Sequence, residues 1–160
     1  MNVLIYSRNE IEEIIDSGKF LENTAVISFY DPKIKRIDRN YSHSDYRGVC
    51  ENVFYSELDD LDLDCMKEKG YTYNTYFPEA DEIAEFVYNV YNNGMDIICQ
   101  CEYGQSKSVR TAVAILEHFF KSGIWGQTTN IIRISWYSIK FLTHSKNTEK
   151  NNFHKFSENY

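Results

Sequence analysis

The chain has 160 residues, of which 42% are hydrophobic and 26% are charged, and these values are typical of one soluble globular domain. The formal net charge of −7 argues against a general nucleic-acid-binding protein, because such proteins usually carry a basic surface. No apolar run approaches the length that spans a membrane, and the N-terminus lacks the basic start and apolar core of a signal peptide. We therefore expect a cytoplasmic protein that binds neither membranes nor nucleic acids.

The first half of the chain predicts three strands and one helix, with strands at residues 3–6, 24–29 and 52–58. The helix between the first two strands begins with a capping box of Ser7 and Glu10 and ends at Gly18. Asp31-Pro32 indicates a turn after the second strand. Residues 33–50 are polar and basic, and we expect a loop there with one short helical turn at most.

The second half begins with an acidic loop at 59–64, and residues 67–73 show no clear periodicity. Pro78 favours the first turn of a helix that carries an apolar face and ends at Asn93-Gly94. A strand at 95–100 leads to Cys101, and a helix at 109–120, closed by Gly123, follows. Asn130 is expected to cap a last helix, and the polar segment 144–160 is expected to fray.

This order of elements predicts one α/β domain over residues 1–143, folded as a three-layer sandwich. Its central sheet would be largely parallel, with four or five strands flanked by helices. Active sites in such folds lie at the carboxyl ends of the strands, where Cys101 is expected. The four cysteines, at positions 50, 65, 99 and 101, show no CxxC pair and no histidine at zinc-ligand spacing. We expect free thiols, no metal and no other cofactor.

The octapeptide at 101–108, Cys-Glu-Tyr-Gly-Gln-Ser-Lys-Ser, joins the last of these strands to the helix after it. A short loop between a buried strand and a helix N-terminus turns successive N–H groups toward one point, where an anion is stabilised. The same field favours a thiolate at Cys101. The octapeptide therefore predicts a phosphate site beside a nucleophile.

These residues resemble the signature of the cysteine-dependent protein-tyrosine phosphatases, in particular the small bacterial dual-specificity-like members, and the resemblance covers roughly residues 1–120. The signature is a cysteine, five residues, an arginine, and then serine or threonine. Cys101, Gly104, Ser106 and Ser108 fit it, whereas Lys107 stands in place of the arginine. Gln100 also replaces the histidine that often precedes the cysteine. The resemblance implies a tyrosine-phosphatase-like fold and the hydrolysis of phosphomonoesters, on a protein or a small molecule, through a cysteinyl-phosphate intermediate.

The resemblance also implies a role for each residue of the loop. Cys101 would attack phosphorus, and Ser108 would help the thiolate to leave in the second step, unless it only bonds to the helix backbone. A general acid is expected from an upstream loop; Asp60 aligns best, with Asp59 and Asp62 close to it. The backbone amides of the loop would bind the phosphate oxygens: those of Glu102, Tyr103, Gly104, Gln105, Ser106 and Lys107.

Lys107 determines how fast such an enzyme could be. Arginine offers a planar fork that binds two phosphoryl oxygens, whereas lysine offers a compact point charge. By analogy with one lost oxyanion donor, the exchange costs about 2–4 kcal/mol, or a factor of ~10²–10³ in rate. We therefore expect slow catalysis, unless Arg110 reaches back from one helical turn further along.

Several alternatives remain open. The chain could be a catalytically impaired phosphate- or phosphoprotein-binding module. It could also be a nucleotide-binding P-loop protein, because Gln-Ser-Lys-Ser resembles the end of a Walker A motif, although Cys101 and Ser106 stand where that motif needs glycines. Cys99, on the same face of the strand as Cys101, is either a small buried hydrophobe or a redox partner. A basic run is either a solvated loop or a rim that attracts a phosphorylated substrate: Lys33, Lys35, Arg36 and Arg39.

Overall fold

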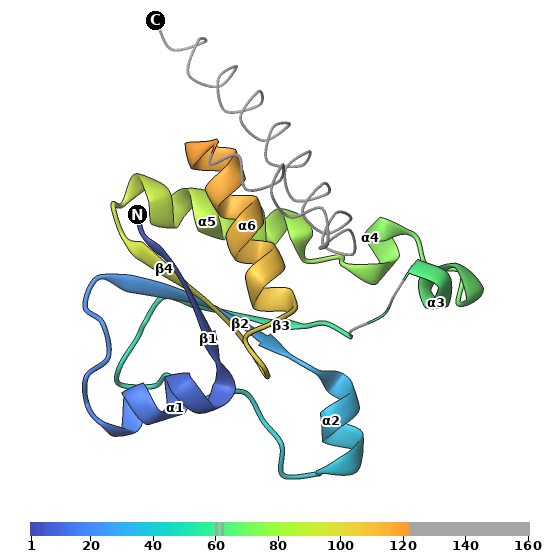
Figure 1. Cartoon of the computed structure of the whole chain (residues 1–160), viewed down its shortest axis with the longest axis horizontal. Helices are drawn as coiled ribbons and strands as arrows, with labels where there is room; N and C mark the ends of the chain where they lie inside the picture. The colour runs from blue at the N-terminus through green and yellow to red at the C-terminus, as the bar shows by residue number, and fades with distance from the viewer. Residues whose placement is uncertain (60, 62, 122–160) are drawn as a thin grey trace, which may run out of the picture.

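The computed structural model describes residues 1–59, 61 and 63–121. Within them, four parallel strands form one sheet in the order β1-β4-β2-β3 (Figure 1). The predicted α/β fold with a largely parallel sheet of four or five strands is thereby confirmed. The strands are β1 (Val3–Ser7), β2 (Thr24–Tyr30), β3 (Val53–Glu57) and β4 (Asp96–Cys101).

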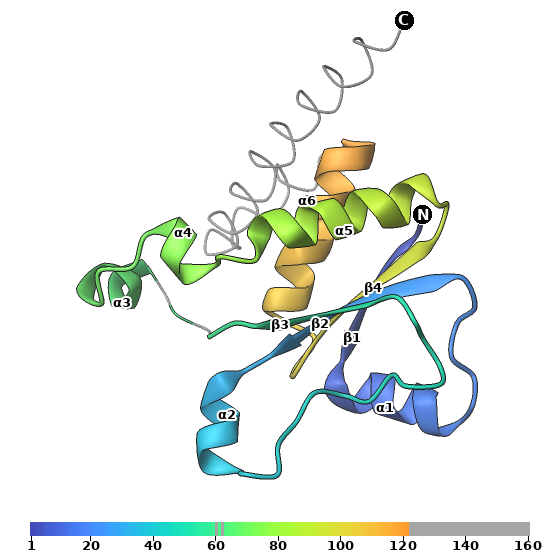
Figure 2. The ribbon, with the colours of Figure 1, turned by 180° about the vertical axis from the view of Figure 1, so that it is seen from behind.

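Helices cover both faces of the sheet and complete the three layers. Helix α1 (Arg8–Asp16) lies on one face, and α5 (Ala80–Asn92) and α6 (Lys107–Phe120) lie on the other (Figures 1 and 2). Three short helices occupy the connections: α2 (Pro32–Ile37), α3 (Leu63–Glu68) and α4 (Tyr73–Tyr76).

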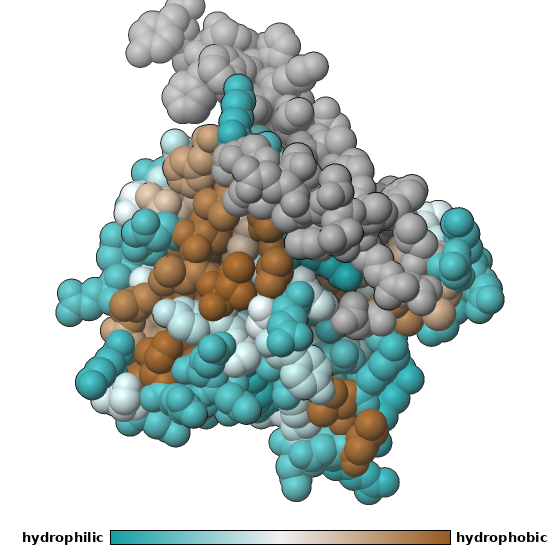
Figure 3. Space-filling model, viewed as in Figure 1, coloured by the Kyte–Doolittle hydropathy of each residue, from teal (hydrophilic) through white to brown (hydrophobic). Residues whose placement is uncertain are grey.

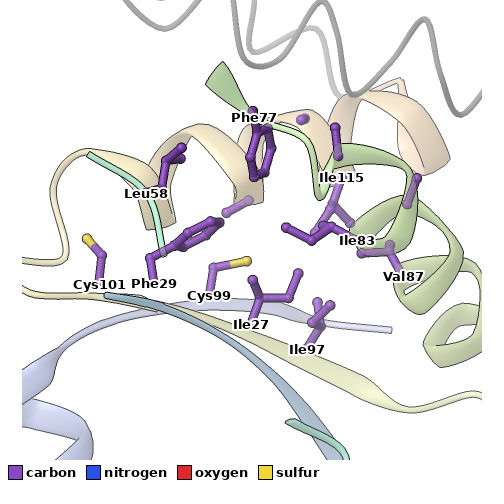
Figure 4. Close-up of a cluster of buried hydrophobic side chains, with 14 of the residues drawn as sticks. Ile27, Phe29, Leu58, Phe77, Ile83, Val87, Ile97, Cys99, Cys101 and Ile115 are labelled. Carbon is purple, nitrogen blue, oxygen red and sulfur yellow. The ribbon is translucent and has the colours of Figure 1, made fainter. Parts of the chain in front are cut away.

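The core is built on the two central strands. Every residue of β2 is buried, as expected of a parallel strand with neighbours on both sides and helices on both faces. Ile27 and Phe29 contribute to the larger apolar cluster, under α5 and α6 (Figure 4), whereas Val26 packs with Ile11 of α1 on the opposite face. The alternation along one strand thus supplies both faces of the core.

The start of α1 follows the prediction. The Ser7 backbone N–H donates to Glu10 Oε2 at 2.7 Å, and the Glu10 N–H donates to Ser7 Oγ at 3.3 Å, which completes the capping box. Gly18, with φ of +67°, follows the helix end. The structure confirms both local signals, the capping box and the glycine after the helix, and each acts over three or four residues.

The structure corrects the prediction in the connections. Asp31-Pro32, interpreted as a turn, starts the six-residue helix α2, with Asp31 as its N-cap and Pro32 in its first turn. The segment 63–68, placed in the acidic loop and the stretch after it, is helix α3. Helix α5 begins at Ala80, so Pro78 precedes the helix rather than joining its first turn.

Helix α6 begins at Lys107, two residues earlier than predicted, and ends at Phe120, where Lys121 adopts a left-handed conformation with φ of +47°. The predicted closing glycine, Gly123, lies outside the described residues. So do the helix expected from Asn130, the domain end at residue 143 and the tail at 144–160. Among the helices of the described part, none is long and apolar enough to span a membrane.

Candidate active site

Cys101 occupies the middle of the carboxyl edge of the sheet. It is the last residue of β4, which lies between β1 and β2. Cys101 pairs in register with Ser7, and Gln100 pairs with Ser28, so the three strands end side by side. The sulfur is buried, and its side chain points to the same side of the sheet as Phe29 (Figure 4).

The loop after Cys101 packs against the junction of β1 and α1. The Arg8 N–H donates to the Glu102 carbonyl oxygen at 3.2 Å. Gly104 has φ of +66°, and a Cβ there would lie 2.9 Å from the Ser7 nitrogen, closer than a carbon can approach. Glycine is thus required both by the left-handed backbone and by the contact with the neighbouring strand.

Four polar groups converge on the Cys101 sulfur. Ser108 Oγ lies 3.0 Å from Sγ, and the backbone N–H groups of Gly104, Ser106 and Ser108 also bond to it. Burial alone would raise the pKa of this thiol, but the hydrogen bonds outweigh burial, and the pKa lies below its ordinary value. The loop therefore stabilises a thiolate at the position where the sequence predicts a nucleophile.

Lys107 is the first residue of α6, and its side chain is only 8% exposed. Its ammonium lies 3.4 Å from Oδ2 of Asp31, which follows the end of β2. Sequence reasoning missed Asp31 as a site residue. The available signal was its position directly after a buried strand, at the edge where parallel strands end.

Arg110 lies one turn further along α6 than Lys107. From the sequence, it is a candidate substitute for an arginine at position 107. Its backbone N–H donates to the Ser106 carbonyl oxygen at 3.0 Å. Its side chain lines a small, largely apolar pocket beside Lys107, and the rest of the lining comes from β2, α6 and two connecting segments: Phe29, Leu58, Phe77, Thr111 and Ala114.

The side chain of Glu102 contacts residues outside the loop, and Tyr103 and Gln105 are exposed. The carboxylate of Glu102 accepts a hydrogen bond from the Tyr41 hydroxyl and lies 4.0 Å from the Arg8 guanidinium. Burial and this bond raise the pKa of Tyr41, so Tyr41 remains a donor to Glu102. The Tyr103 side chain is 74% exposed, and Gln105 is exposed as well.

Gln100 lies on the other face of β4, away from the sulfur. Its Oε1 accepts hydrogen bonds from Ser28 Oγ at 2.6 Å and from the Tyr46 hydroxyl at 3.3 Å. Gln100, Ser28 and Tyr46 are all buried. Gln100 therefore belongs to a buried polar network that holds β4 beside β2.

The acidic loop is only partly described. Asp60, the predicted general acid, and Asp62 lie outside the described residues. Asp59 has its carboxylate 2.7 Å from Lys33 Nζ, and its carbonyl oxygen accepts from the Tyr76 hydroxyl. One lysine of the basic run thus already has an acidic partner, and Lys35 lies over the ring of Tyr30.

Cys99 is fully buried on the same side of the sheet as Cys101 (Figure 4), and burial raises its pKa. All four cysteines are free thiols. Cys99 therefore packs as a small apolar side chain in the larger core cluster.

Within the described ranges, no group of three or more His, Cys, Asp or Glu side chains could hold a metal ion. No family model, curated protein or solved structure matches this chain. What supports a function is therefore the geometry around Cys101, together with the resemblance of the 101–108 octapeptide to a phosphatase signature.

Proposed function

We propose that this protein is a cysteine-dependent phosphatase that hydrolyses phosphomonoesters of a protein or a small molecule through a cysteinyl-phosphate intermediate. One observation carries the proposal: two loop amides, the first-turn amide of Ser108 and the Ser108 hydroxyl converge on the sulfur of Cys101. A set of donors that stabilises a thiolate at a helix N-terminus also suits the charged oxygens of a phosphoryl group whose phosphorus the thiolate attacks. The free thiols fit a reducing compartment such as the cytoplasm.

The reaction proceeds in two displacements. The Cys101 thiolate attacks phosphorus, the bond from phosphorus to the ester oxygen breaks, and a general acid gives that oxygen a proton. Water then attacks the cysteinyl phosphate and loses a proton to the same group, and inorganic phosphate leaves. In that second step the electron pair returns to sulfur, where the Ser108 hydroxyl, 3.0 Å away, stabilises the thiolate. Asp60 stays the prediction for the acid.

Lys107 makes this a slow enzyme. Its ammonium supplies charge without the planar guanidinium fork of arginine, which would bind two equatorial oxygens. The ammonium also forms an ion pair with Asp31. The expected cost of about 2–4 kcal/mol in transition-state binding leaves turnover measurable.

A second candidate is a phosphate- or phosphoprotein-binding module. The ion pair between Lys107 and Asp31 favours it, because a cation already paired with a carboxylate contributes less to a transition state. Such a module would keep the loop amides and Cys101 but would release its ligand unchanged.

Hydrolysis of a small aryl phosphate separates the two candidates. If the protein is an enzyme, we expect slow turnover by the wild type. Cys101→Ser should abolish this turnover, Cys50→Ser should leave it unchanged, and Lys107→Arg should accelerate it. Cys50 is a suitable control because it lies in the connection before β3, at the opposite edge of the sheet. An inactive wild type that gains turnover with Lys107→Arg would support the binding module. Failure of all variants to bind or hydrolyse phosphate would refute both.

A further inference from the structure

The carboxylate of Asp31 connects two elements that are distant in the sequence. One oxygen, Oδ1, accepts the backbone N–H of Lys33 at 2.9 Å and so caps helix α2. The other, Oδ2, lies 3.4 Å from the ammonium of Lys107, the first residue of α6. Asp31 is itself mostly buried, with its side chain 18% exposed.

The capping bond gives the Asp31 carboxylate a fixed position. Pro32, with its restricted φ, forms the first turn of α2 and limits the backbone next to Asp31. Because β2 and β4 are adjacent and in register, the end of β2 lies beside the start of the loop. Asp31 is therefore a fixed negative charge at the edge of the sheet where Cys101 lies.

Lys107, by contrast, has a long side chain that is free to rotate in the absence of a partner. Ordering such a side chain when a ligand arrives costs affinity, and ordering it beforehand avoids that cost. The pair with Asp31 orders this side chain, and the apolar side chains of Phe29, Leu58 and Phe77 line the pocket beside it. An ammonium has three N–H donors, so a single contact with Asp31 leaves donors for an anion.

We propose that Asp31 is a positioning residue of the anion site: it holds the ammonium of Lys107 beside the loop, so that a lysine can act as an ordered phosphate ligand. This inference rests on the proposed function. The negative charge of Asp31 also repels an anion, so the two effects of removing it have opposite signs. We expect the ordering of Lys107 to outweigh the repulsion between Asp31 and the anion.

The test is the affinity for inorganic phosphate, measured by calorimetry on the whole chain. Asp31→Asn removes the charge, yet asparagine caps a helix as well as aspartate does, so α2 keeps its N-cap. We expect about 5- to 10-fold weaker binding in Asp31→Asn and partial recovery in Asp31→Glu. Asp45→Asn is the matched control, because Asp45 forms an exposed ion pair with Arg47 on the surface.

A double-mutant cycle shows whether Asp31 acts through Lys107. In a Lys107→Met background, Asp31→Asn should cause no further loss of affinity. Equal or tighter phosphate binding by Asp31→Asn in the wild-type background would overturn the inference. So would an equally large loss of phosphate affinity when Asp31→Asn is introduced into the Lys107→Met background. Thermal unfolding of each variant identifies any that fails to fold, in which case Asp31→Glu supplies the comparison. Absence of phosphate binding by the wild type would refute the proposed function itself, together with this inference.

Discussion

Replacing Ser108 with alanine should raise the pKa of Cys101. Ser108 is fully buried, and its hydroxyl lies 3.0 Å from the sulfur, so no bulk water can take its place. A hydrogen bond to a charged group is worth about 1.5–3 kcal/mol, and about 1.4 kcal/mol corresponds to one pKa unit. We therefore expect the pKa to rise by about one to two units, with the three backbone donors still in place.

The measurement is the absorbance of the thiolate in the ultraviolet as a function of pH. Each protein is compared with the same protein carrying Cys101→Ser, which removes the contributions of the other thiols and the tyrosines. Ser17→Ala is the control, because that hydroxyl bonds to the Ile14 carbonyl oxygen at the end of α1. A pKa in Ser108→Ala that equals or falls below the wild-type value would refute the argument that this hydroxyl stabilises the thiolate.

Three further predictions concern the loop and its support. Gly104→Ala should abolish phosphate binding and lower the midpoint of urea unfolding, because the Cβ of the alanine would meet the Ser7 nitrogen. Gly48→Ala is the control, since Gly48 has a similar positive φ but no atom near the position of its Cβ. Phosphate binding that is equally reduced in the two variants would contradict the contact argument. Ser7→Ala should lower the free energy of unfolding by about 1 kcal/mol through the loss of the capping box, measured in urea, and an unchanged value would show that the cap contributes nothing. Burial holds the pKa of His43 below its ordinary value, so the unfolded chain takes up a proton more readily and stability should fall between about pH 7 and pH 5; a fall just as steep in His43→Gln would exclude His43 as its cause.

Features that depend on neighbours in the sequence were predictable. The capping box at Ser7 and Glu10, the buried strand before Cys101 and the helix after it each have signals within a few residues. The parallel sheet follows from the alternation of strands and helices. Helix α3 was missed, and α2 was expected only as one short turn within a loop, because six residues do not complete two helical turns, too few to establish a helical period.

The contacts that shape the site join distant parts of the chain. Asp31 and Lys107 are 76 positions apart, and Tyr41 and Glu102 are 61 apart. Nothing in either local segment identifies its partner, because the pairs form only when β2 and β4 lie side by side. Sequence reasoning could therefore place Cys101 and its loop, but it could not find the carboxylate that faces Lys107.

An apolar surface over β1 and α6 is a further feature that the sequence did not predict. Apolar side chains gather over β1 and α6 on the face seen in Figure 3. Among the large apolar residues of these two elements, Ile5 is 40% exposed and Phe120 is 46% exposed.

The most direct test of the central claim is to trap the intermediate. The protein is mixed with an aryl phosphate, quenched in acid after a short interval, digested and examined by mass spectrometry. The two-displacement mechanism predicts one phosphate adduct on the peptide that contains Cys101, and none in Cys101→Ser. Hydrolysis that continues in Cys101→Ser, or turnover by the wild type with the adduct on another residue, would contradict it.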